Sequence, residues 1–156
     1  MTASSEPVRI GFIGAGGICR DRHLPGLKKV DGAEVVAVVN RSRASSEAVA
    51  RDFDIPEVAD RWQDLLDRPD LNAIFIGTWP YMHRTLTLSA LERGKHVLTQ
   101  ARMANTAQEA RDMLEASLRH PDLVCQLVPT SQTYRIDNVL KRMIGDGFLG
   151  EILSVE

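Results

Sequence analysis

The sequence predicts an α/β protein built on a doubly wound parallel sheet with helices on both faces. Short apolar runs alternate along the chain with segments of helical periodicity, which is typical of strands joined by crossover helices. The apolar runs are continuous, as expected for parallel strands buried on both faces. The length of 156 residues and the 44% of hydrophobic residues suit one domain with a sizeable core.

Each expected element follows from its own local pattern. The expected strands are the apolar runs 8–13, 34–39, 72–76, 96–98 and 123–128, and the expected helices are 17–30, 43–53, 62–66, 81–91, a helix beginning after Thr106, and 136–144. Ser42 is a suitable N-cap for the second helix. Thr106 and Glu109 fit a capping box. Ala107, Ala110, Leu114 and Leu118 then share one helix face.

Composition and charge exclude several classes of function. Lys and Arg number 19 and Asp and Glu 21, so the net charge of 19 − 21 = −2 does not favour binding to nucleic acid or to anionic lipid. No apolar run approaches the ~20 residues of a membrane span, and residues 1–7 do not resemble a signal peptide. We expect residues 1–7 to be a disordered tail. Two cysteines without a framework or metal-ligand spacing indicate a cytoplasmic location and no metal site.

The glycine cluster after the first run is the first feature that indicates a ligand. Gly14, Ala15, Gly16, Gly17 and Ile18 lie between an expected strand and an expected helix, which is the context of a dinucleotide fingerprint. Glycines there permit a tight turn and close approach to a pyrophosphate, and the helix N-terminus offers free N–H groups. Cys19 takes the third glycine position and is predicted to be a packed thiol. The alternative is a glycine turn without a ligand.

The end of the second expected strand predicts which cofactor is bound. An acidic residue there would bond the adenosine ribose of NAD and repel the 2′-phosphate of NADP. This chain has Asn40, Arg41 and Ser42 instead, which favours NADP, with Arg41 pairing with the phosphate. NAD stays possible because Asn40 can bond a ribose hydroxyl. Arg41 can also be read as an ordinary solvated arginine.

The segment after the third expected strand supplies candidates for the nicotinamide end. Thr78, Trp79 and His83 follow that strand, and open α/β sheets bind ligands at the carboxyl ends of their strands. We predict that Trp79 lies against a nicotinamide or substrate ring and that His83 contacts the cofactor side. The alternatives are a partly buried loop tryptophan and a structural histidine.

Several segments together resemble the N-terminal NAD(P)-binding Rossmann domain of the Gfo/Idh/MocA oxidoreductases. They are the glycine cluster through 23–27, Thr78-Trp79-Pro80 with His83, the run 90–98, and the closing run 147–152. The resemblance implies oxidoreduction of a sugar, polyol or related hydroxy or keto compound, with the segment from Thr78 lying along the cofactor towards the nicotinamide. It further implies a Rossmann domain over 8–148, the first strand of a second, substrate domain over 149–156, and a parent chain that forms homo-oligomers through that missing domain.

One departure from the family pattern concerns catalysis. Where the family usually has Glu-Lys-Pro, this chain has Gln100-Ala101-Arg102. Gln100 can bond the nicotinamide end of the cofactor without carrying charge. Ala101 cannot shuttle a proton, and Arg102 stays charged, although it can stabilise a developing alkoxide. The catalytic group is therefore unassigned, and Arg102, His83 and Tyr134 are the candidates.

Two hypotheses from different classes follow. The first is the cofactor half of an NAD(P)-dependent oxidoreductase, in which the 156-residue chain binds NADP(H) without turnover. The second is a non-catalytic nucleotide-binding or sensing module. A folded domain without nucleotide affinity is a third reading.

Overall fold

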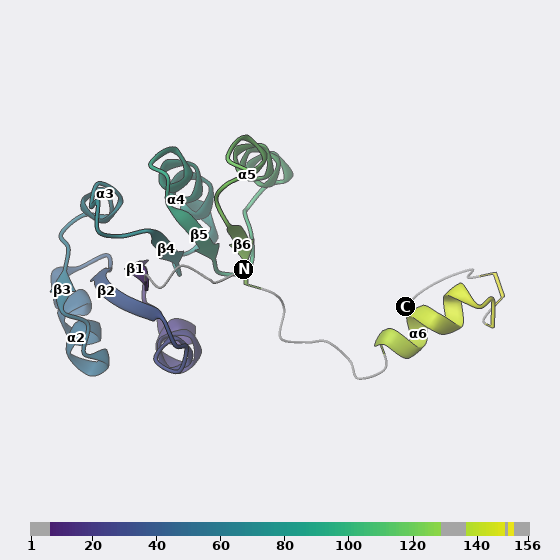
Figure 1. Ribbon diagram of the computed structural model, residues 1–156, viewed down its shortest axis with the longest axis horizontal. Helices are drawn as coiled ribbons and strands as arrows, with labels where there is room; N and C mark the ends of the chain where they lie inside the picture. The colour runs from purple at the N-terminus through teal and green to yellow at the C-terminus, as the bar shows by residue number, and fades with distance from the viewer. Residues whose placement is uncertain (1–6, 129–136, 149, 152–156) are drawn as a thin grey trace.

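The computed structural model describes residues 7–128, 137–148 and 150–151. These residues contain a six-stranded sheet in the order β3-β2-β1-β4-β5-β6 (Figure 1). Every neighbouring pair in the sheet is parallel, which confirms the predicted doubly wound arrangement. The expected tail, Tyr134 and the strand-like run at the C-terminus lie outside the described residues, apart from Pro7 and residues 150–151.

The strands are β1 (Val8–Ile13), β2 (Ala33–Val39), β3 (Glu57–Val58), β4 (Ala73–Ile76), β5 (His96–Thr99) and β6 (Cys125–Leu127). The helical elements are η1 (Cys19–His23), α1 (Leu24–Leu27), α2 (Arg43–Phe53), α3 (Trp62–Leu66), α4 (Pro80–Glu92), α5 (Ala107–Arg119) and α6 (Asp137–Gly145). The short strand β3 had no counterpart in the sequence prediction, because two residues are too few to show a period.

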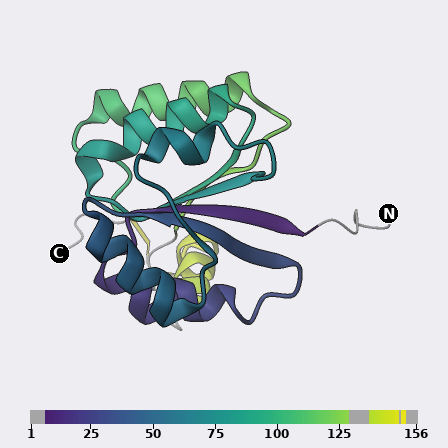
Figure 2. The ribbon, with the colours of Figure 1, turned by 90° about the vertical axis from the view of Figure 1, so that its left-hand side faces the viewer.

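Helices cover both faces of the sheet (Figure 2), and each face has its own hydrophobic core. One core joins β-strand residues such as Ile74 and Ile76 to Leu65 of α3 and Leu86 of α4. The second core lies on the η1, α1 and α2 side and centres on Phe12 and Phe75, whose rings stack at 4.4 Å between centroids. Burial on both sides explains why the strands are continuous apolar runs.

Local sequence signals located several helices correctly. The bounds of α2 and α3 agree with the prediction. Ser42 caps α2 by accepting a hydrogen bond from the Ser45 N–H. Thr106 and Glu109 form the predicted capping box of α5.

The structure corrects the predicted end of the first helix and shows which face of α5 is buried. The first helix ends at Leu27, before the predicted 30, and its middle is the π-helical segment η1, in which the Leu24 N–H bonds the Cys19 carbonyl. The packed face of α5 carries Met113 and Ala116, while Leu114 and Leu118 are exposed. Spacing alone groups residues into faces, but contact with α4 decides which face is buried.

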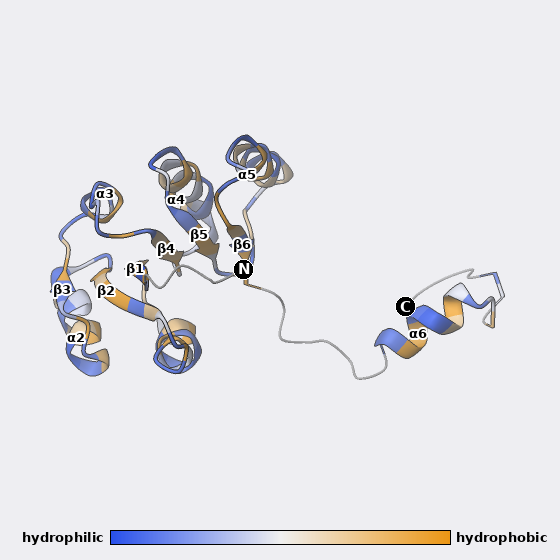
Figure 3. Ribbon diagram, viewed as in Figure 1, coloured by the Kyte–Doolittle hydropathy of each residue, from blue (hydrophilic) through white to orange (hydrophobic). Residues whose placement is uncertain are grey.

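Helix α6 is amphipathic, and none of its residues is buried. Figure 3 shows its orange and blue segments, which mark an apolar and a polar side. Among the described parts of the chain, no helix is long and apolar enough to cross a membrane.

Candidate functional site

The glycine loop is packed tightly against the loop that follows β4. Gly14 has a φ of 86°, and a Cβ on it would lie 2.6 Å from the Thr78 methyl group. A Cβ on Gly77 would lie 2.5 Å from the Gly14 carbonyl oxygen and closer still to the Cys19 sulfur. Two glycines are therefore required for these two loops to meet at the carboxyl edge of the sheet.

The outer side of the same loop is open. A Cβ on Gly16 or on Gly17 would meet no atom within 4 Å, and both residues are exposed. This is the bare backbone surface that close approach of a pyrophosphate needs. The glycine loop thus fits the phosphate part of a dinucleotide cofactor.

Counting backbone donors shows which N–H groups an anion can use. The Gly14 N–H bonds the Val39 carbonyl at 2.8 Å, and the Gly16 N–H bonds the Gly14 carbonyl at 3.0 Å. The Ala15 N–H donates to the Asn40 side-chain oxygen at 2.7 Å. The N–H groups of Gly17 and Ile18 open the helix, where no preceding turn supplies acceptors. These two donors are therefore available to a phosphate.

Asn40 connects the glycine loop to the start of α2. Its amide oxygen accepts the Ala15 N–H, and its amide nitrogen donates to the Ser45 hydroxyl at 2.9 Å. The side chain is therefore held by protein partners at both ends. Asn40 therefore holds the loop, and the second lone pair of its amide oxygen leaves the predicted bond to a ribose hydroxyl possible.

The next two residues remain accessible. Arg41 is exposed, and its side chain makes no ion pair within the described residues, whereas Arg43 pairs with Glu47 and Asp60. Ser42 accepts from the Ser45 N–H, which leaves its own hydroxyl proton free to donate. Arg41 and Ser42 thus form an accessible donor pair without a neighbouring free carboxylate.

Cys19, in the third position of the glycine fingerprint, is a packed thiol as predicted. It is fully buried, and burial raises its pKa to about 11, opposed by a hydrogen bond with the Gly16 backbone. A thiol with a raised pKa is a poor nucleophile at neutral pH. Cys19 therefore serves packing beneath the loop.

The other half of the carboxyl edge follows β4 and β5. Trp79 is 76% exposed, and Thr78 is half-buried beside the glycine loop. Gln100 follows β5, and its side-chain oxygen lies 2.7 Å from the Nε2 atom of His23. Since an amide oxygen only accepts, His23 donates and the amide nitrogen of Gln100 is left as a free donor. Sequence reasoning missed His23, although it lies in one of the segments that carry the family resemblance.

His83 lies inside the protein, not on the surface of the site. It is fully buried. Its Nε2 atom lies 2.9 Å from the Thr78 carbonyl oxygen, and its Nδ1 atom lies 2.8 Å from the Arg102 carbonyl oxygen. Both ring nitrogens face backbone, so the ring has no edge left for a cofactor or a proton transfer. Its place is between the β4–α4 and β5–α5 loops.

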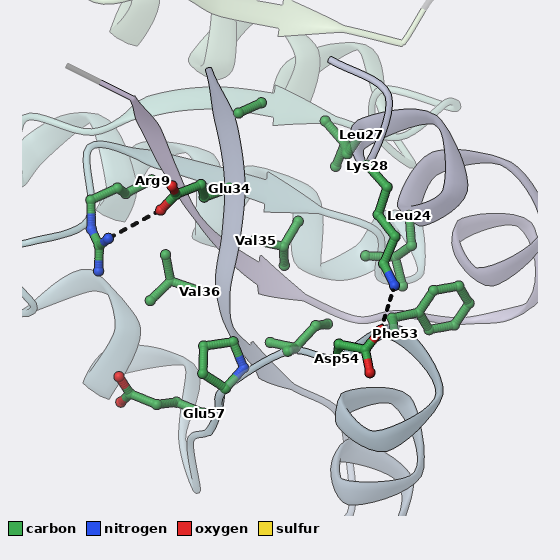
Figure 4. A pocket seen from close by; sticks show the side chains of 13 residues that line it. Arg9, Leu24, Leu27, Lys28, Glu34, Val35, Val36, Phe53, Asp54 and Glu57 are labelled. Atoms are coloured by element: carbon green, nitrogen blue, oxygen red, sulfur yellow. Dashed lines mark hydrogen bonds and ion pairs between the residues drawn. The ribbon is translucent and has the colours of Figure 1, made fainter. Parts of the chain in front are cut away.

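A groove lies at the opposite edge of the sheet. It has a volume of about 430 Å³ and lies between α1, the first half of β2 and the α2–β3 connection (Figure 4). Its charged side chains pair with one another, as Lys28 does with Asp54 and Arg9 with Glu34. With its charges paired, this groove presents no free charged group to a ligand, so the glycine loop is the better candidate site. Among described residues, no cluster of three or more metal-ligating side chains occurs.

A parallel sheet of this strand order, with an open glycine loop between β1 and the first helix, defines a dinucleotide-binding Rossmann domain. The chain belongs to the Gfo/Idh/MocA oxidoreductases: residues 8–131 match that family, described as an oxidoreductase family with an NAD-binding Rossmann fold.

The chain is similar to curated enzymes over most of its own length. It is 31% identical over 152 residues to inositol 2-dehydrogenase of Serratia proteamaculans. The aligned segment covers 95% of this chain and 44% of that protein. It is 33% identical over 147 residues to dTDP-3,4-didehydro-2,6-dideoxy-alpha-D-glucose 3-reductase of Saccharopolyspora spinosa, covering 94% and 44%. The chain thus spans less than half the length of these relatives.

Solved structures share the fold at lower identity. A 3-ketoreductase from Actinomadura kijaniata in complex with NADP and TDP-benzene superposes with a TM-score of 0.79 at 24% identity, covering 94% of this chain and 45% of that one. Scyllo-inositol dehydrogenase from Lactobacillus casei with bound NAD(H) and scyllo-inositol also gives a TM-score of 0.79, at 22% identity, covering 94% and 43%.

Proposed function

We propose that this chain is the cofactor-binding part of an NAD(P)-dependent oxidoreductase that acts on a sugar, a polyol or a related hydroxy or keto compound. The observation that carries the proposal is the open glycine loop. Its Gly17 and Ile18 N–H groups have no acceptor among the described residues, while the N–H groups of Gly14, Ala15 and Gly16 are bonded within the protein. Relatives that include inositol dehydrogenases and a sugar 3-reductase support the substrate class.

Each part of the site has its own task in this proposal. Gly16, Gly17 and Ile18 hold the pyrophosphate, Arg41 and Ser42 meet the adenosine end, and Thr78, Trp79 and Gln100 meet the nicotinamide end. When bound, the cofactor supplies or accepts hydride at its nicotinamide ring. His83 keeps the two loops at the nicotinamide end together, and Asn40 keeps the glycine loop beside the β2–α2 loop.

NADP is the preferred cofactor in this proposal. No carboxylate follows β2, and Arg41 is exposed without an ion pair among described residues. A guanidinium group suits a 2′-phosphate, since charge-assisted hydrogen bonds are the strong ones. NAD is expected to bind more weakly, because it lacks the 2′-phosphate with which Arg41 would pair.

A calorimetric titration of the 156-residue chain with NADP⁺ and with NAD⁺ tests the proposal. Binding of both, with NADP⁺ tighter, is the expected result. We also expect this chain alone to give no turnover, because Gln100-Ala101-Arg102 offers no group suited to carry a proton. Absence of heat with either cofactor would contradict the proposed function.

Arg41→Ala tests the phosphate contact. Loss of one charge-assisted pair raises the Kd for NADP⁺ about 10- to 100-fold, while the Kd for NAD⁺ changes less than about twofold. The matched control is Arg51→Ala, which removes an exposed arginine on α2 and leaves both affinities unchanged. Equal losses for the two cofactors would remove Arg41 from the phosphate site.

A non-catalytic nucleotide-binding or sensing module is the second candidate. It is favoured by Gln100-Ala101-Arg102, which offers no proton carrier, and by the engagement of both His83 nitrogens. Turnover by a longer form of the protein with any polyol or sugar would eliminate this candidate. We further propose a cytoplasmic location, supported by two free cysteines, and homo-oligomerisation of a longer parent through its substrate domain.

A further inference from the structure

Two charged side chains lie at the loops of the nicotinamide end: Arg102, and Glu109, whose carboxylate accepts hydrogen bonds from the Asn105 and Thr106 N–H groups. The β4–α4 loop, 77–79, and the β5–α5 loop, 100–106, contain no Asp or Glu of their own. Arg102 is their one charged side chain; it is exposed and forms no ion pair or side-chain hydrogen bond within the described residues. In contrast, the arginines Arg20, Arg68, Arg84 and Arg93 all pair with carboxylates. Arg102 is thus, like Arg41, an exposed guanidinium group without a carboxylate partner among the described residues.

The backbone that carries Arg102 is held in place from inside the protein. The buried His83 ring has its Nδ1 atom 2.8 Å from the Arg102 carbonyl oxygen and 3.2 Å from that of Met103. The Gln100 N–H bonds the Ile76 carbonyl at 2.8 Å. Two anchors therefore fix the segment on either side of Ala101. Fixing the backbone reduces the entropy that a bound ligand would cost, as in preorganised binding sites.

The neighbouring polar group is also a donor. His23 occupies the Gln100 side-chain oxygen at 2.7 Å, which leaves the amide N–H₂ unused. Arg102 has donors only. A ligand held by these two side chains must therefore supply hydrogen-bond acceptors. A neutral polyol would use its hydroxyl oxygens there but not its hydroxyl protons. Exposed Trp79 and Tyr81 add apolar surface nearby.

We propose that the substrate carries a carboxylate that binds Arg102, so that it is a sugar acid or another hydroxy or keto acid. The planar guanidinium fork matches the two oxygens of a carboxylate, and the Gln100 amide donates to a further oxygen of the same molecule. This inference rests on the proposed function, because it places the acid beside the nicotinamide.

The test is a pair of calorimetric titrations on the full 156-residue chain. NADP⁺ is titrated first, and its failure to bind would defeat the proposed function itself. The chain saturated with NADP⁺ is then titrated with D-gluconate and with sorbitol, which share a six-carbon skeleton and differ at one end. Gluconate is expected to bind at least about tenfold more tightly than sorbitol, with an affinity that falls as salt rises.

Variants at Arg102 assign the effect to that side chain. Arg102→Gln makes the two affinities equal, Arg102→Lys retains part of the difference, and neither changes the Kd for NADP⁺ more than about twofold. Arg119→Gln is the matched control, since Arg119 is an exposed arginine on α5 and its loss leaves the gluconate preference intact. Melting temperatures of all variants verify folding.

Four outcomes would overturn the inference while the cofactor still binds. They are equal affinities in the unsubstituted chain, no binding of gluconate, an equal effect of Arg119→Gln, and tighter binding of sorbitol 6-phosphate than of gluconate. The last would identify a phosphate ester as the anionic substrate in place of a carboxylate.

Discussion

Gly16→Val abolishes measurable binding of both cofactors, with an increase in Kd of about 100-fold or more. The side chain would occupy the open surface above the glycine loop, where a Cβ now meets no atom within 4 Å. That surface is where the pyrophosphate must approach the backbone. Because Gly16 has no positive φ, valine introduces no backbone strain, and we expect the melting temperature to change little.

Calorimetric titration and thermal unfolding of the same samples check this expectation. Gly16→Ala gives a smaller loss of affinity, because a methyl group projects less far into the surface. Gly26→Ala serves as the control, since Gly26 lies in α1 and also has open space around it, but away from the loop. Titration curves unchanged by Gly16→Val would remove the pyrophosphate from this loop.

Gly77→Ala is expected to destabilise the fold, in contrast to Gly16→Val, which is expected to affect cofactor binding and to leave the melting temperature nearly unchanged. The added Cβ would lie 2.5 Å from the Gly14 carbonyl oxygen, and still closer to the Cys19 sulfur. Overpacking of a tight core costs about 1–3 kcal/mol, and here one of the two obstacles is backbone. We therefore expect a loss near 3 kcal/mol in the free energy of unfolding, together with weaker NADP⁺ binding, because the Gly14 turn must shift.

Denaturant unfolding measures this loss, and a double-mutant cycle with Cys19→Ala divides it. Removing the sulfur relieves one of the two contacts, so Gly77→Ala costs less in the Cys19→Ala background. Part of the loss in the free energy of unfolding remains, because removing the sulfur leaves the contact with the Gly14 carbonyl oxygen in place. The same cost in both backgrounds would show that Cys19 does not contact residue 77.

The candidate site was predictable where its chemistry is local in sequence. The glycine cluster, its position between β1 and the first helix, and the absence of an acidic residue after β2 all lie within short segments. The open space at Gly16 and the accessible Arg41 agree with those predictions. Residue types with a fixed local conformation, such as a glycine turn, carry this information directly.

Contacts between distant segments were not predictable in the same way. The Ala15–Asn40 bond spans 25 residues, the His83–Arg102 bond 19, and the His23–Gln100 bond 77. These bonds show that Asn40 and His83 support loops, and the burial of His83 leaves it no surface for a cofactor. They also left the amide nitrogen of Gln100 as a donor, on which the carboxylate inference depends.

The sequence by itself determined the class of fold, the helices with clear caps and the location of the glycine loop. Periodicity, capping and turn chemistry act within a few residues and can be read along the chain. The tertiary structure decided which face of α5 is buried, why Gly77 has no room for a side chain, and which polar groups remain free at the carboxyl edge. Those properties depend on which atoms of remote segments meet, and a hydrogen-bonding group is free only after its neighbours across the sheet have taken their partners.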